Sequence, residues 1–239
     1  MSLAARLLNV FAVPGEVFTE VSTTRLTAGN WVVPMLLSAV IGAVSVFIIF
    51  SQPAIQQKIH EQQEKMFQKQ VDAGQMKQAD ADKIAEAMSN PMLLKIAGSG
   101  GAVMVSVTRL FWWALVLWLL GRWFLKVQVR YPKALEVAGL AMMIGVLEGI
   151  VVLLLTVNLG RMFATPSLAL AITDFDATRK SHLFLGAANV FAFWQIGVTS
   201  VGLAKLAGVP FLRAAVLVFA YWCLQESFFI MVGLGQLAL

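Results

Sequence analysis

Four polar residues lie near the middle of long apolar segments of the chain, where ionisable side chains are rare. They are Arg109, Glu148, Gln195 and Glu226. A charged side chain that faces lipid at the centre of a membrane costs at least about 2.5–3.5 kcal/mol. We therefore expect the four side chains to point inward, and helices that alternate in direction would bring them to a similar depth.

Two carboxylates and one guanidinium leave this polar cluster with one excess negative charge. Desolvation disfavours a bare charge, so either one Glu is protonated at neutral pH or a cation or substrate amine compensates it. One interpretation is a structural lock, in which an Arg–Glu ion pair, a neutral Glu and a Gln hydrogen bond fix the helix register. The other is a functional, proton- or cation-linked site. We favour the lock, because the sequence predicts no helix break at this depth and such breaks are common in transporters.

Other motifs offer little chemistry. Asp174-Phe175-Asp176 supplies too few ligands for a divalent cation, so a solvated loop is favoured. Glycines at 98, 100 and 101 begin an apolar segment, which favours a close helix contact over phosphate binding. Glu136 and Arg213 lie near span ends and can reach the interface. The phosphate-loop, zinc-protease and serine-hydrolase patterns are absent from the sequence. We expect no enzymatic activity, no catalytic residue, no metal and no cofactor.

The composition identifies the elements that must position the cluster. The chain has 239 residues, of which 59% are apolar and 13% charged, whereas a soluble domain carries about 25% charged residues. This excludes a soluble enzyme and a disordered chain. Spanning the hydrocarbon core takes roughly 20 helical residues. Stretches of sufficient length are 31–50, 98–121, 134–158, 183–204 and 212–236. Since barrel-type alternation is absent, the sequence predicts an all-α, polytopic membrane protein with five transmembrane helices in a single domain, 1–239.

Three further segments flank these spans. Residues 1–30 carry apolar residues at helical spacing, interrupted at Pro14, and predict two short interfacial helices. Residues 52–90 are polar with a thin apolar stripe and predict an extramembrane helical hairpin. Whether that stripe contacts lipid, its partner helix or another chain stays open. The run 162–172 is too short to cross, so it lies in the interface or folds back.

Basic residues in short loops predict the orientation in the membrane. If the N-terminus is cytoplasmic, eight basic residues face the cytoplasm: Arg6, Arg25, Arg122, Lys126, Arg130, Lys133, Lys205 and Arg213. Three lie outside, namely Arg161, Arg179 and Lys180, when the charge-balanced polar segment is set aside. We therefore predict a cytoplasmic N-terminus and an external C-terminus. No cleavable signal peptide is visible, so the first span is expected to be retained.

Short motifs in this arrangement resemble a known family. They are Asn9-Val10-Phe11, the run Pro14-Gly15-Glu16-Val17-Phe18, Trp31-x-x-Pro34 and Asp72-Ala73-Gly74-Gln75-Met76. The chain resembles the bacterial branch of the Yip family, the Rab/Ypt-interacting five-span membrane proteins. The resemblance implies a five-span fold in the bacterial inner membrane. The Tyr-Gly-Pro-type motif of the eukaryotic, trafficking branch is missing, since the tyrosines are Tyr131 and Tyr221, so a GTPase partner is not implied.

We therefore predict a non-enzymatic, Yip-like membrane organiser or adaptor that associates with itself through seams of small residues. Its expected partner is the lipid bilayer; a protein partner is unknown, and nucleic acid is not expected. The alternative is a small transporter or channel that uses the polar cluster for a proton, a cation or a small cationic substrate. A transporter should have a polar cavity that connects the cluster to one face, whereas an adaptor should have a sealed core.

Overall fold

The computed structural model describes the chain except residues 54–55, 58–66, 69, 73, 89–90, 161–163, 173–174, 177–178, 234 and 236–239. The described residues form helices and no β-strand. The helices are α1 (Leu3–Ala12), α2 (Pro14–Thr23), α3 (Gly29–Ile49), α5 (Gln78–Met88), α6 (Pro91–Leu119), α7 (Tyr131–Leu159), α8 (Lys180–Ala187), α9 (Val190–Ala207) and α10 (Phe211–Met231). A π-helical turn, Leu120–Phe124, extends α6, and a short 3-10 helix covers Leu168–Ala171.

Five helices are long and apolar enough to cross a membrane: α3, α6 with its π-helical turn, α7, α9 and α10. The predicted all-α, five-span fold is therefore confirmed. The second span is longer than expected, since it runs from Met92 to Phe124. Its first turn includes Lys95, whose Nζ lies 5.9 Å from the centre of the Phe47 ring on α3. A long basic side chain can place its charge at the interface in this way, so Lys95 does not prevent the helix from beginning earlier.

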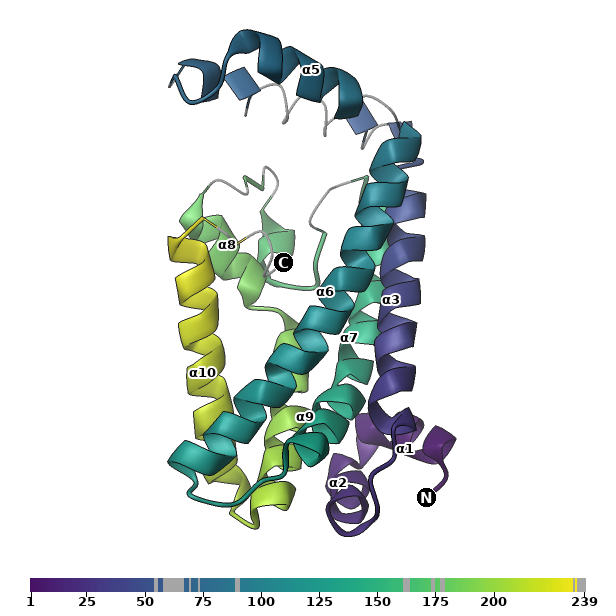
Figure 1. Cartoon of the computed structure of the whole chain (residues 1–239), viewed down its shortest axis with the longest axis vertical. Helices are drawn as coiled ribbons and strands as arrows, with labels where there is room; N and C mark the ends of the chain where they lie inside the picture. Colours follow the sequence, from purple (N-terminus) through teal and green to yellow (C-terminus); the bar gives the residue numbers. More distant parts are fainter. Residues whose placement is uncertain are drawn as a thin grey trace.

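The bundle is built around α7, which packs against α3, α6 and α9, while α10 packs against α9 (Figure 1). Small residues allow the central helices to approach closely. A Cβ atom added to Gly139 of α7 would overlap Trp31 of α3, and one added to Gly202 of α9 would overlap Val137 of α7. Both glycines therefore serve contacts inside one copy of the chain.

The two N-terminal helices lie at the lower end of the bundle (Figure 1). α1 packs against α7 and α2 packs against α9. Val10, Val17, Phe18 and Val21 are fully buried. The sequence predicted two short helices with apolar faces here. In the structure these faces pack against the ends of α7 and α9.

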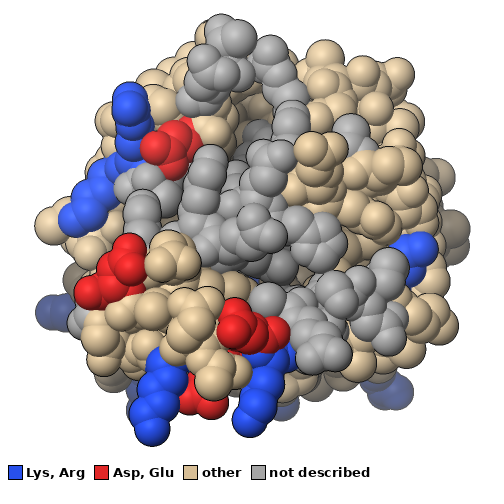
Figure 2. All heavy atoms as spheres, turned by 90° about the horizontal axis from the view of Figure 1, so that it is seen from above, with Lys and Arg blue, Asp and Glu red and all other residues tan. Residues whose placement is uncertain are grey.

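The opposite end of the bundle carries the polar segment, with α5 lying across the top (Figure 1). The second helix of the predicted hairpin is present as α5, and Gly74 precedes it with a left-handed φ of 68°. Much of the first predicted helix lies outside the described residues, although Phe67 of its apolar stripe is buried. Seen from above, positive and negative side chains are intermingled on this face (Figure 2).

The fourth predicted span is not a continuous helix. α8 ends at Ala187 and α9 begins at Val190. The segment that precedes α8 folds back against the break, because Ser167 forms a bridge with Asn189 and the Val190 amide donates to the Pro166 carbonyl at 3.2 Å. The expectation of unbroken helices is therefore wrong. The cause is local: the Asn189 side chain accepts a hydrogen bond from the Phe191 amide at 2.9 Å and caps a new helix.

Candidate functional site

Two residues of the polar cluster are joined by a hydrogen bond. Arg109 of α6 donates from Nη2 to Oε1 of Gln195 on α9 at 3.2 Å. Gly145 of α7 lies beside this bond, since a Cβ added there would be 3.7 Å from Gln195 Oε1 and 4.0 Å from Arg109 Nη1. Three helices therefore meet at this point, and the small residue on α7 leaves room for both long side chains.

The two carboxylates of the cluster have different surroundings. Glu148 of α7 accepts a hydrogen bond from Asn189 Nδ2, at the break between α8 and α9. Glu226 of α10 is nine-tenths buried, and its Oε2 atom has no hydrogen-bond partner among the described residues. Asn189 was not predicted to belong to the cluster. An Asn within an apolar run is a signal for a helix cap, and that signal could have identified the residue.

Arg109 is not paired with either carboxylate. Within the part of the chain that the structure describes, no carboxylate oxygen lies within 4.0 Å of its guanidinium nitrogens. The side chain of Arg109 is exposed at the surface of the bundle. The hydrogen bond expected of the structural lock is present, and the ion pair expected of it is absent from these residues.

A second polar network, which the sequence analysis missed, connects α6 to α10. Trp112 Nε1 donates to the Tyr221 hydroxyl at 2.8 Å and to Gln225 Oε1 at 2.9 Å. The Tyr221 hydroxyl donates to the same Gln225 oxygen at 2.8 Å. Trp113 packs edge-on against Tyr221, with 5.6 Å between ring centres. Aromatic residues in a span are usually taken as interface anchors, so the sequence alone did not reveal this network.

A buried charge network joins the N-terminal helices to the bundle. Glu136 of α7 is 1% exposed and forms an ion pair with Lys133 at 2.6 Å. It also accepts hydrogen bonds from the Thr27 amide at 2.7 Å and from Asn30 Nδ2 at 2.9 Å. Glu136 was expected to reach the interface, and the structure corrects this: Thr27, just before α3, and Asn30, in its first turn, supply donors in place of water.

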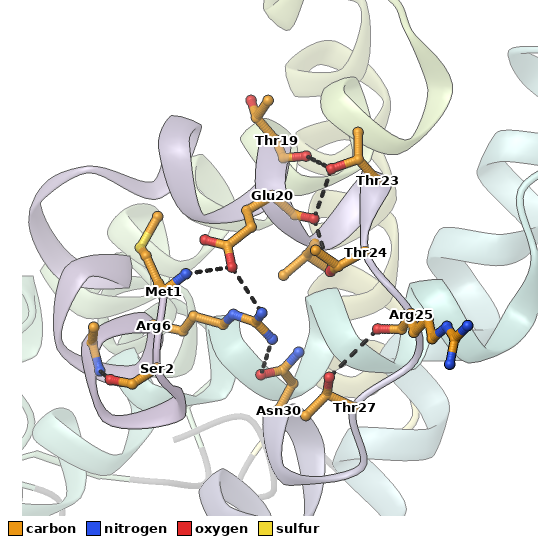
Figure 3. Close-up of polar contacts among 12 residues, drawn as sticks. Met1, Ser2, Arg6, Thr19, Glu20, Thr23, Thr24, Arg25, Thr27 and Asn30 are labelled. Atoms are coloured by element: carbon orange, nitrogen blue, oxygen red, sulfur yellow. Dashed lines mark hydrogen bonds and ion pairs between the residues drawn. The ribbon is translucent and has the colours of Figure 1, made fainter.

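The same network continues onto α1 and α2 (Figure 3). The Arg6 guanidinium forms an ion pair with Glu20 at 2.8 Å and donates to Asn30 Oδ1 at 3.4 Å. The Met1 amine also reaches Glu20, at 2.6 Å. Hydrogen bonds from the Met1 amine and from Arg6 hold the pKa of Glu20 below its ordinary value. α1, α2, the start of α3 and the start of α7 are thus connected by ion pairs and hydrogen bonds.

A shallow groove of about 480 Å³ lies next to this network, lined by Gly15, Glu16, Thr19, Glu20, Thr23 and Lys205. None of the four cluster residues lines it. The predicted connection between the cluster and one face is therefore not made by this groove.

The described residues contain no group of three His, Cys, Asp or Glu side chains that could hold a metal ion. Of the Asp174–Asp176 motif, Asp174 lies outside the described residues. Asp176 lies 3.5 Å from Arg179 as an ion pair, and its amide donates to His182 Nδ1 at 3.0 Å.

Comparison with known proteins identifies a family. The model of the Yip1 domain matches residues 8–234, which is nearly the whole chain. Comparison with curated proteins and with solved structures returned no match. The matched region includes all five spans, α2 and the second half of α1. The chain is therefore an integral membrane protein that belongs to the Yip1-domain family.

Proposed function

We propose that the protein is a non-enzymatic organiser or adaptor in the bacterial inner membrane, with its N-terminus in the cytoplasm. The observation that carries this proposal is the network of buried Glu136, Asn30 and Arg6 with partly buried Lys133 and Glu20. These contacts attach α1 and α2 to the end of the bundle. Apolar faces alone would allow the two helices to move away into the lipid interface. A preformed surface of this kind favours binding of a partner, because little conformational entropy is lost when the partner binds.

The chemistry of this surface supports an acidic partner. Exposed basic residues at the same end of the bundle are Arg25, Arg122, Lys126, Arg130, Lys205 and Arg213. Together they favour contact with acidic protein segments and with anionic lipid headgroups. The seams at Gly139 and Gly202 are occupied inside one copy, so association between copies would use other surfaces.

The test is site-specific photocrosslinking in intact cells, with the crosslinker placed at Arg130 on the proposed surface or at exposed, lipid-facing Leu224 as the control. We expect a discrete crosslinked product from position 130 and none from position 224. Glu136→Gln, which weakens the network, should reduce that product at equal protein level. Identical patterns from both positions would contradict the proposal.

A second candidate function is a small transporter or channel for a proton, a cation or a small cationic substrate. The specific observation in its favour is the break between α8 and α9 at Asn189, which bonds to Glu148. Broken helices at charged residues are typical of transporter binding sites. Proton and potassium flux into vesicles that contain the purified protein tests it, with Glu148→Gln and Glu226→Gln expected to abolish the flux.

A further inference from the structure

Arg109 presents a charge at the surface of the bundle in the middle of the span Met92–Phe124. One of its nitrogens bonds to Gln195, and no carboxylate oxygen among the described residues lies within 4.0 Å of it. An exposed guanidinium at this depth is expensive in hydrocarbon and normally faces water, a polar group or an anion. Its other N–H donors therefore require partners that the described residues do not supply at ion-pair distance.

The surface around Arg109 lies between α6 and α10. α6 packs on α3 and α7, whereas α10 packs on α9 and α8, so α6 and α10 are joined mainly by side chains. The two helices approach at their lower ends and diverge toward the upper end (Figure 1). We call this region the α6–α10 seam and define it by Arg109, Trp112, Gln195, Tyr221, Gln225 and Glu226.

The seam combines a guanidinium that has no ion pair among the described residues with a carboxyl group that has one unpartnered oxygen there. Arg109 is the positive group, and guanidinium groups bind phosphate through paired, charge-assisted hydrogen bonds. Glu226 is the acidic group: it is nine-tenths buried, and its enclosed Oε2 has no partner among the described residues. When ionised, such an oxygen favours an ammonium donor, which reaches it once α6 and α10 separate. A ligand that carries both a phosphate and an ammonium group would complement the two together.

We infer that the α6–α10 seam admits the zwitterionic headgroup of a phospholipid into the middle of the membrane, and thereby lets lipids exchange between the two leaflets. The phosphate binds Arg109, the ammonium group lies toward Glu226, and the acyl chains stay in the bilayer beside the apolar faces of α6 and α10. The contacts of Trp112 and Trp113 with Tyr221 and Gln225 close the lower end of the seam, so they control passage. This inference shares residues with the second candidate function but requires no ion flux.

The experiment reconstitutes the full chain into phosphatidylcholine vesicles with about one-tenth phosphatidylglycerol. A trace of acyl-labelled fluorescent phosphatidylethanolamine reports leaflet exchange, because dithionite added outside bleaches only the outer leaflet. We expect exchange to be faster than in protein-free vesicles. Arg109→Gln should slow it by about tenfold, as for loss of a charge-assisted hydrogen bond. Trp112→Ala, which removes the lower closure, should accelerate it.

Two controls separate the seam from general effects of the protein. Arg179→Gln changes an exposed arginine that precedes α8, outside both the seam and the basic surface of the lower end, and should exchange lipid at the wild-type rate. Acyl-labelled phosphatidylglycerol, which lacks the ammonium group, should exchange more slowly than phosphatidylethanolamine.

Three results would overturn the inference: wild-type exchange no faster than in protein-free vesicles, an Arg109→Gln rate equal to wild type, or equal rates for the two labelled lipids. Proton or potassium flux in the same vesicles without lipid exchange would overturn it too and would support the second candidate function instead. Lipid exchange without ion flux would support the seam and count against the second candidate.

Discussion

Glu136 carries a charge that is enclosed by partners from two chain segments, Thr27 and Asn30 on one side and Lys133 on the other. Breaking such a network is costly, because the remaining partners stay buried without their counterpart. We expect Glu136→Ala to lower the free energy of unfolding by about 3–5 kcal/mol, the range for a buried pair in a soluble protein, or less if the membrane reference state supplies new partners. Thermal unfolding in detergent measures the loss.

The matched control is Glu16→Ala, which removes an exposed acid from neighbouring α2 and should change stability little. Equal melting temperatures for the wild type and the Glu136→Ala variant would contradict the importance of the network.

Glu20 makes the attachment of the N-terminal helices sensitive to acid. Its pKa is lowered by hydrogen bonds from the Met1 amine and from Arg6, and its ordinary value is 4.5. A carboxyl with a lowered pKa stabilises the folded state above its ordinary pKa, and this stabilisation is lost as the pH falls through the folded-state pKa. Amide hydrogen exchange in α1 should therefore rise, relative to α7, when the pH is lowered below 4.5. In Glu20→Gln this dependence should be much weaker, and an unchanged profile would exclude Glu20 as its cause.

For single residues, the sequence predicts which charged side chains lie within the membrane. It does not predict which atoms form hydrogen bonds with them. Arg109 and Gln195 were expected to share a depth, and the structure joins them at 3.2 Å. Glu148 instead bonds to Asn189, and Trp112 bonds to Tyr221. These choices depend on how each helix is rotated about its axis, which residue spacing along a mostly apolar helix does not determine.

The break between α8 and α9 is the element whose local chemistry is most open to a test. Asn189 performs two tasks there, since its side chain oxygen caps α9 and its nitrogen donates to Glu148. In Asn189→Ser the side chain keeps a capping oxygen but is too short to donate a hydrogen bond to Glu148. Asn189→Ala loses both contacts. We expect Asn189→Ala to lose about 0.5–2 kcal/mol more than Asn189→Ser, the usual contribution of a cap. Denaturant unfolding of both variants in detergent measures the difference. Equal losses would show that capping does not stabilise the start of α9.

The elements themselves are predictable to different degrees. α3, α7 and α10 follow from apolar length alone, because hydrocarbon admits no other backbone structure for a single segment. The break at Asn189 does not follow, since one Asn in an apolar run is compatible with both a buried helix and a new cap. The π-helical turn at Leu120–Phe124 has no signal that we recognise in the sequence.

The two ends of the whole molecule differ in charge, and this difference predicts its orientation. The N-terminus lies at the lower end, and α10, the last helix, ends toward the upper end (Figure 1). The lower end carries exposed Arg25, Arg122, Lys126 and Arg130, while acidic and basic side chains are mixed on the upper face (Figure 2). Reporter fusions at positions 1, 75 and 239 should place the first in the cytoplasm and the other two outside. A cytoplasmic signal at position 239, with five spans intact, would contradict the orientation.

The break before α9 also has a consequence for the bilayer around the protein. α9 has 18 residues, so its length is about 27 Å, whereas the hydrocarbon core is about 30 Å thick. The neighbouring α7 has 29 residues, about 44 Å, and exceeds that thickness. A hydrophobic length below the local thickness is met by bilayer thinning. The bilayer that borders α9 should therefore be thinner than average. Lipids with short acyl chains should be enriched along this side of the bundle.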